Sequence, residues 1–166
     1  MQKVGKIAFA LVTGVIGLLY ITRAVNYTVI DNLHLVIHEA GHLLLTFCGE
    51  FIYILGGSLM QLAVPITFIV YFYRRRDRYA MGFALIWLGL SAINLSYYIA
   101  DARAKILPLL GGEGSIHDWE YLLSKLHLLS ADAFLGGLTF IVGAAVVITG
   151  VVIMIRDGLS RTTEMV

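Results

Sequence analysis

Residues 131–155 read ADAFLGGLTFIVGAAVVITGVVIMI and contain one charged side chain, that of Asp132. An apolar run of about 18 residues or more is typical of a helix that crosses a lipid bilayer. Three glycines of this run, Gly136, Gly137 and Gly143, predict close helix contact, because small residues let helix backbones approach each other in a membrane. The run therefore predicts a transmembrane helix that packs closely against a neighbour.

Further apolar segments precede this run. They lie at about residues 7–23, 33–48, 51–73 and 79–100. Hydrophobic residues make up 59% of the chain and charged residues 14%, whereas soluble domains average about 25% charged residues. We therefore predict an all-α, multi-pass integral membrane protein, located in the cell membrane if the source is prokaryotic. Residues 1–166 are expected to form one domain, a bundle of about four or five transmembrane helices.

The segment at 51–73 is irregular, because a Gly-Gly-Ser step at 56–58 and Pro65 interrupt it. Such residues free backbone groups that lipid cannot satisfy, and they are tolerated where the backbone is buried in protein or lines a wet cavity. Residues 51–61 are therefore predicted to form either a re-entrant hairpin or part of a kinked helix.

The long loop at 105–130 is predicted to contain an amphipathic helix. Ser115 precedes Asp118 by three residues, which resembles the capping box that begins many helices. From Trp119 onward, leucines recur at helical spacing while polar side chains fill the other face. This pattern is typical of a helix that lies at the membrane interface.

Charge and cysteine content exclude some functions. The net charge is +1 with no basic stripe, so no nucleic-acid partner is expected. Cys48 is the single cysteine, which excludes an internal disulfide and a cysteine zinc cluster, and we expect it to be buried. The arginine-rich stretch 74–78 is expected to be cytoplasmic, together with the C-terminus, and five crossings would place Lys3 and Lys6 on the opposite side.

The segment at 33–48 contains the motif HEAGH at residues 38–42. His38 and His42 are four residues apart and share a helix face, so both can bind one ion. In the H-E-x-x-H pattern these histidines hold Zn²⁺ and the glutamate, here Glu39, acts as the general base on water. Ionisable side chains are costly in an apolar segment and are functional candidates by default.

His34 offers a second pair with His38, also at a spacing of four residues. His34 and His42 are about 12 Å apart along a helix that rises about 1.5 Å per residue, so all three cannot bind one ion. A leucine follows His34, whereas the base follows His38, and Gly41 lets another element approach the second pair. We therefore expect His34 to have a supporting, gating or structural role.

A third zinc ligand must come from elsewhere in the chain. Asp101 is the first candidate, since it ends the segment at 79–100 and lies on the same helical stripe as Asn94. His117 and Asp118 are the alternative, because the glycine-rich loop can bring them to the motif.

These features resemble the site-2 protease family of intramembrane zinc metalloproteases, over about residues 33–118. In that family an aspartate in an N-x-x-P…L-D-G motif on a later transmembrane helix is the third ligand. Here Asn94 and Asp101 match the asparagine and the aspartate, whereas the proline is missing and Ala102-Arg103 replaces the glycines. The chain resembles a minimal, divergent member.

The resemblance implies a zinc metalloendopeptidase that hydrolyses a peptide bond in or near a transmembrane segment of a client protein. His38, His42 and Asp101 would hold the zinc, and Glu39 would move the proton from water to the leaving amine. Asn94 would donate a hydrogen bond to the substrate backbone or to the oxyanion. The segment at 51–61 would offer a strand edge to the substrate, and the helix at Trp119 would act as a lid.

Two other functions remain open from the sequence. ZIP-type metal transporters also place His and Glu in a membrane helix, although they have more spans and further metal-site motifs than this chain. A catalytically silent relative would bind transmembrane clients without cleaving them, although such a protein has no need to keep Glu39. Substrate, cleavage site and oligomeric state are not specified by the sequence.

Overall fold

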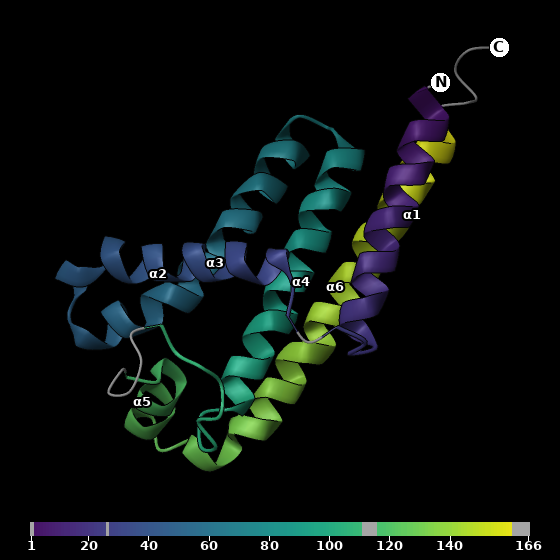
Figure 1. Ribbon diagram of the computed structural model, residues 1–166. Helices are drawn as coiled ribbons and strands as arrows, with labels where there is room; N and C mark the ends of the chain where they lie inside the picture. Colours follow the sequence, from purple (N-terminus) through teal and green to yellow (C-terminus); the bar gives the residue numbers. More distant parts are fainter. Residues whose placement is uncertain (1, 26, 111–115, 161–166) are drawn as a thin grey trace.

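The computed structural model describes residues 2–25, 27–110 and 116–160, and the regular elements in this part of the chain are all helices (Figure 1). They are α1 (Gln2–Ile21), α2 (Val29–Leu44), α3 (Glu50–Arg74), α4 (Arg78–Ala100), α5 (Asp118–Lys125) and α6 (Asp132–Ser160), with two short 3-10 helices, η1 (Thr46–Cys48) and η2 (Leu129–Ala131). The predicted all-α class is confirmed.

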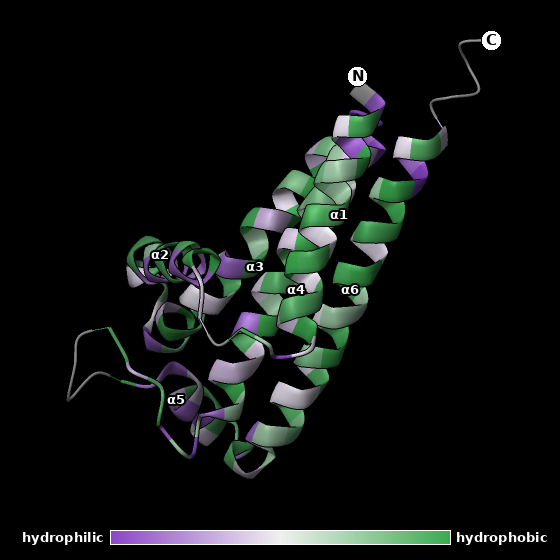
Figure 2. Cartoon of the chain, turned by 45° about the vertical axis from the view of Figure 1, so that its right-hand side comes forward, coloured by the Kyte–Doolittle hydropathy of each residue, from purple (hydrophilic) through white to green (hydrophobic). Residues whose placement is uncertain are grey.

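Within the described residues, four helices are long and apolar enough to cross a membrane. They comprise residues Lys3–Ile21, Glu50–Arg74, Arg78–Ala100 and Leu129–Ser160. The helix that carries the HEAGH motif, α2, is not among them and lies across the direction of the other long helices (Figures 1 and 2). It has 16 residues and is about 24 Å long, less than the roughly 30 Å of a bilayer core. By length and composition α2 is therefore not a candidate span, and the span predicted at 33–48 stays a prediction.

The most extensive helix pair among the described residues is α4 with α6, and glycines bring the two backbones together. A Cβ atom on Gly136 would lie 2.7 Å from the carbonyl oxygen of Ser96, and one on Gly143 would lie 2.9 Å from that of Gly89. The predicted close contact is confirmed for these two glycines. It is wrong for Gly137, where a Cβ atom would have no described neighbour within 4 Å.

Helix α3 is continuous from Glu50 to Arg74, through the glycine step at 56–58 and through Pro65. Of the two structures predicted for residues 51–61, the helix is observed and the re-entrant hairpin is not. Helical hydrogen bonds also occupy the backbone here, so these residues do not offer the strand edge that the resemblance implied. Instead, Gly56, Gly57 and Pro65 lie on the buried side of α3.

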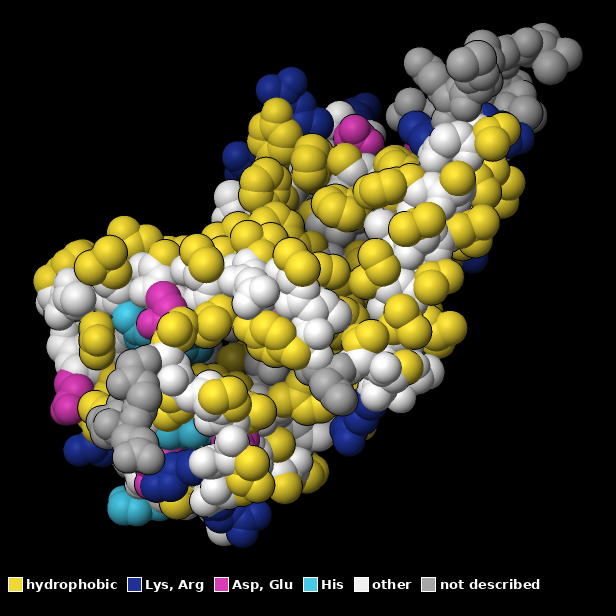
Figure 3. All heavy atoms as spheres, in the orientation of Figure 1, with side chains coloured by type: hydrophobic (Ala, Val, Ile, Leu, Met, Phe, Trp, Pro, Cys, Tyr) yellow, Lys and Arg dark blue, Asp and Glu magenta, His cyan; other side chains and the backbone are white. Residues whose placement is uncertain are grey.

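Several basic residues lie together at one end of the bundle. Lys6 on α1 forms an ion pair with Asp157 on α6 at 3.5 Å, and the Tyr79 hydroxyl on α4 donates to the Lys6 carbonyl at 2.6 Å. The α3–α4 turn with its arginines lies at this end as well, where Figure 3 shows Lys and Arg side chains. The prediction that Lys6 and the arginines lie on opposite sides is therefore wrong.

Two local predictions also change. Cys48 lies in η1 and is exposed, so the expected burial is wrong. The helix predicted after Trp119 is present as α5, although it is only eight residues long and its cap is His117, whose Nδ1 accepts from the Glu120 amide. Ser115, the predicted cap, lies outside the described residues.

Candidate metal centre

Capping and spacing fix the orientation of α2. The Thr28 hydroxyl caps the first turn, and the Asp31 carboxylate accepts a hydrogen bond from the Thr28 amide at 2.7 Å, which completes a capping box. The buried residues of the helix then recur every three or four positions: Asp31, His34, His38 and Gly41. One face of α2, including the first histidine of the motif, is therefore turned into the protein.

Glycines let α3 lie directly against this face. A Cβ atom on Gly41 would collide with the carbonyl oxygen of Gly56, and a Cβ atom on Gly57 would collide with Nε2 of His38. The prediction that Gly41 permits the close approach of another element is confirmed. The glycine step that interrupts the apolar pattern of α3 thus makes room for α2 and for an imidazole ring.

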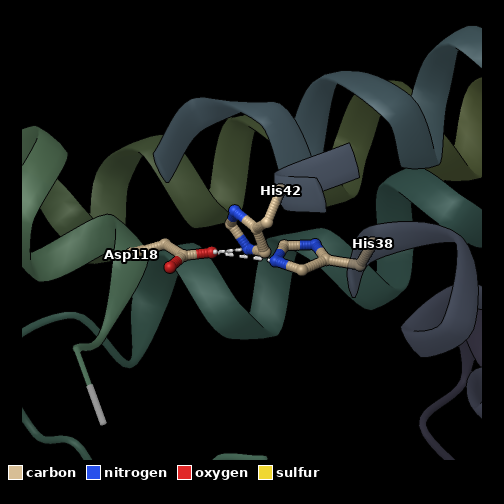
Figure 4. Close-up of side chains that lie close together, drawn as sticks. All are labelled: His38, His42 and Asp118. Carbon is tan, nitrogen blue, oxygen red and sulfur yellow. Dashed lines mark hydrogen bonds and ion pairs between the residues drawn. The ribbon is translucent and has the colours of Figure 1, made fainter. Parts of the chain in front are cut away.

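The two histidines of the motif meet a carboxylate from α5. Nε2 of His38 lies 2.8 Å from Oδ2 of Asp118, and Nε2 of His42 lies 3.1 Å from the same oxygen (Figure 4). These three ligand atoms lie within 4.8 Å of one another and form the one group in the described part of the chain that can hold a metal ion. Both predicted histidines are present in it, and its third member is the predicted alternative Asp118.

The opposite sides of both imidazole rings face oxygen atoms. Nδ1 of His42 lies 2.8 Å from the backbone carbonyl of Tyr53, which can only accept, so this nitrogen carries a proton. Nδ1 of His38 lies 3.2 Å from Oε1 of Gln61. In a neutral ring a proton on Nδ1 leaves a lone pair on Nε2, and in both histidines Nε2 is the nitrogen that lies beside Oδ2 of Asp118. Two imidazoles with one carboxylate form a donor set that suits zinc.

The contacts among these three side chains also shift the pKa values of Asp118 and His42. Burial acts to raise the pKa of Asp118, but hydrogen bonds with His38 and His42 outweigh burial and hold this pKa below its usual range. The hydrogen bond with Asp118 raises the pKa of His42 above its ordinary value. A proton and a metal ion therefore compete for the same nitrogen of His42.

Contacts of α5 with the bundle hold Asp118 in place. Its backbone amide donates to the Tyr98 hydroxyl on α4 at 3.0 Å, and the indole N–H of Trp119 donates to the Ser58 hydroxyl on α3 at 3.1 Å. The ring of His117 lies against that of Tyr98, with 4.4 Å between the ring centroids. The short helix is thus attached to both neighbours of the histidine pair.

Asp101, the preferred third ligand in the sequence, is engaged elsewhere. Its two carboxylate oxygens accept hydrogen bonds from the amides of Ile106 and Leu107 at 2.9 and 3.0 Å, so the side chain closes the turn after α4. It also lies 3.4 Å from Nε2 of His117. Among the described residues Asp101 does not join the group of His38 and His42. The position of third ligand, which was predicted first for Asp101, is occupied by Asp118. His117 is the cap of α5 and a neighbour of the group, not a member.

The remaining candidates have distinct surroundings. Asn94 donates to Oδ1 of Asp31 at 2.8 Å and accepts from Nε2 of Gln61 at 2.9 Å, so its amide is used inside the protein and not for the implied contact with substrate. Glu39 is exposed beside the histidines. His34 is completely buried, with Nδ1 3.9 Å from Asp31, in keeping with a non-ligand role.

Two groups of the site were missed in the sequence. Gln61 was noticeable as a polar residue in an apolar segment, and this signal could have assigned it to a histidine on a neighbouring helix. Tyr53 contributes its backbone carbonyl, for which the residue type gives no signal.

Comparison with known proteins does not assign this site to a family. No protein-family model matches the chain, and no curated protein or solved structure matches it significantly. The function of the site must therefore be argued from its own donor atoms and their surroundings.

Proposed function

We propose that this protein is an intramembrane zinc metalloprotease that cleaves a peptide bond in or near a transmembrane segment of a client protein. The observation that carries the proposal is the convergence of Nε2 of His38 and Nε2 of His42 on Oδ2 of Asp118, with the glutamate of the H-E-x-x-H pattern beside it. This ligand set replaces the one implied by the resemblance, in which Asp101 was the third ligand.

His38, His42 and Asp118 would hold the zinc ion in this proposal. Zinc in such a site supplies Lewis acidity and makes water a usable nucleophile near neutral pH. Three protein ligands are typical of a catalytic zinc site, which keeps a further position open, whereas structural zinc sites are closed by four. The donor set thus favours hydrolysis over a purely structural metal.

Glu39 would transfer protons. It follows the first histidine directly and is exposed, so water and substrate can reach its carboxylate. It would take a proton from the attacking water and deliver it to the nitrogen of the departing amine. A carboxylate is required for this step, and the isosteric amide cannot perform it.

The surface beside Glu39 is apolar, which supports a hydrophobic substrate. Val36 and Leu43 lie three residues before and four residues after Glu39 on α2, and they are 67% and 74% exposed. The same spacing places them on the exposed side of the helix with the glutamate. A client segment with apolar side chains would bury these residues as its backbone approaches the site.

The test combines metal content with cleavage. We expect the purified protein to contain one zinc ion per chain and to cleave a transmembrane substrate in proteoliposomes. Glu39→Gln should retain the zinc and lose cleavage, whereas the matched control Glu50→Gln should retain both. Retained cleavage in Glu39→Gln would refute the assigned base. Zinc flux into the proteoliposomes without cleavage would favour the transporter instead.

A further inference from the structure

A chain of hydrogen bonds leads away from His38 through three further side chains. Nδ1 of His38 lies 3.2 Å from Oε1 of Gln61 on α3, and Nε2 of Gln61 lies 2.9 Å from Oδ1 of Asn94 on α4. Nδ2 of Asn94 in turn lies 2.8 Å from Oδ1 of Asp31, at the start of α2. Gln61 is 2% exposed and Asp31 4% exposed, so bulk water does not compete with these contacts.

Groups that can only accept hydrogen bonds fix the direction of this chain. Nε2 of Gln61 also lies 3.2 Å from the backbone carbonyl of Ser91, so this end of the amide must be its NH₂ group. Asp31 accepts hydrogen bonds from the Tyr20 hydroxyl and the Thr28 amide, both at 2.7 Å, as expected of a carboxylate. The end of Asn94 that faces Asp31 must then be an NH₂ group too.

The orientation of the two amides determines the proton on His38. With its NH₂ end turned to Ser91 and Asn94, Gln61 presents its carbonyl oxygen to Nδ1 of His38. An oxygen acceptor at this position requires an N–H, so Nδ1 carries the proton and Nε2 of the neutral ring has the lone pair. The opposite tautomer would place a lone pair against the Gln61 oxygen and leave a buried acceptor unpaired.

We infer that Gln61, Asn94 and Asp31 are positioning residues that keep the Nε2 atom of His38 unprotonated and available for a metal ion. The inference rests on the proposed metal centre. Without the chain of amides, Asp118 at 2.8 Å would favour a proton on Nε2, which would close the site to zinc. Groups that hydrogen-bond the far nitrogen of a metal-binding histidine set its tautomer and raise its basicity, and their loss typically costs about 10–100-fold in metal affinity.

The first test measures zinc affinity by competition with a chromophoric chelator. We expect Gln61→Met to weaken binding by about 10–100-fold and Asn94→Leu to weaken it less, because Ser91 still orients Gln61. The double variant should bind as weakly as Gln61→Met alone, since both changes break one chain. Thr67→Val is the matched control on α3, because the Thr67 hydroxyl donates to the carbonyl of Ala63 within its own helix. Multiplied losses in the double variant would overturn the inference.

The second test detects the tautomer without any metal. Nitrogen-15 NMR of metal-free, histidine-labelled protein at alkaline pH should show the proton of His38 on Nδ1, and in Gln61→Met it should move to Nε2. Gln61→Leu provides the same test if Gln61→Met does not fold. A proton on Nε2 in the unchanged protein, or a tautomer that neither variant alters, would overturn the inference.

The two proposals can fail separately. A protein that binds no zinc or cleaves no substrate refutes the proposed function, whatever the tautomer of His38. A zinc-dependent protease whose His38 tautomer does not depend on Gln61 and Asn94 refutes only the inference about positioning.

Discussion

The choice of third ligand can be tested with one substitution made at two positions, Asp118→Asn and Asp101→Asn. Oδ2 of Asp118 lies 2.8 and 3.1 Å from the two Nε2 atoms, so its carboxylate would be a direct ligand. The oxygens of Asp101 instead bind the amides of Ile106 and Leu107, at 2.9 and 3.0 Å. The change from aspartate to asparagine therefore removes a carboxylate ligand at position 118, whereas at position 101 it weakens the turn after α4.

The expected magnitudes differ accordingly. Loss of a residue that only supports a ligand costs about 10–100-fold in metal affinity, so loss of the ligand should exceed about 100-fold, which corresponds to roughly 2.8 kcal/mol. Asp101→Asn leaves all three donor atoms in place and should change zinc affinity by less than about tenfold. It should lower the free energy of unfolding by about 1–3 kcal/mol, because amides that were bound to a charged acceptor lose it.

The assay is a competition titration with a zinc chelator on the detergent-purified variants, with cleavage of a transmembrane substrate measured in parallel. Circular dichroism on the same samples would verify that both variants are folded. If Asp101→Asn abolished zinc binding and Asp118→Asn retained it, the assignment of Asp118 would be refuted. The ligand set implied by the resemblance would then replace it.

Three further predictions concern pH, packing and topology. In metal-free protein the lowered pKa of Asp118 means that its ionised form stabilises the fold above about pH 3.9, and this stabilisation is lost as the pH falls. The raised pKa of His42 means that its protonated form stabilises the fold below about pH 6.5, and this stabilisation is lost as the pH rises. Thermal melts after chelator treatment should therefore decline on both sides of this window, and a pH-independent melting temperature would contradict the pairing. Gly57→Ala should abolish zinc binding, because the added Cβ atom collides with an imidazole of the site, whereas Gly137→Ala should have no effect on binding. Reporter tags at the start of α1 and in the α3–α4 turn should both be cytoplasmic, and tags found on opposite sides would contradict an even number of crossings between them.

The parts of the site that depend on local spacing were predictable from the sequence. His38 and His42 share a helix face because they are four residues apart, and in the structure the Nε2 atoms of both contact Oδ2 of Asp118. Gly41 was expected to admit another element, and it lies against Gly56 of α3. Periodicity on a single helix is enough for such predictions, because no distant part of the chain has to be placed.

The third ligand was not predictable in the same way. Asp101 directly follows an apolar segment, whereas Asp118 lies in the long loop after it, and the position of Asp118 relative to the histidines depends on how α5 docks. That docking is determined by contacts between distant residues, such as Trp119 with Ser58 and the Asp118 amide with Tyr98. The glycine-rich loop before α5 carries no pattern that specifies these contacts, so both aspartates remained candidates.

The crosswise position of α2 and the polar network around it have a common physical cause. A helix with Asp31, three histidines and Glu39 in 16 residues is costly to place among lipid tails, because ionisable groups there need partners. As it lies across the bundle, α2 can turn its polar face to Gln61, Asn94 and Asp118, which satisfy that face, and can leave apolar residues on its outer side. The exposed face of α2 carries apolar residues, and the buried face carries the ionisable residues that contact polar partners. The mean hydropathy of the segment averages the two faces. It therefore does not show that the polar residues all lie on one side, which becomes visible only in the three-dimensional arrangement.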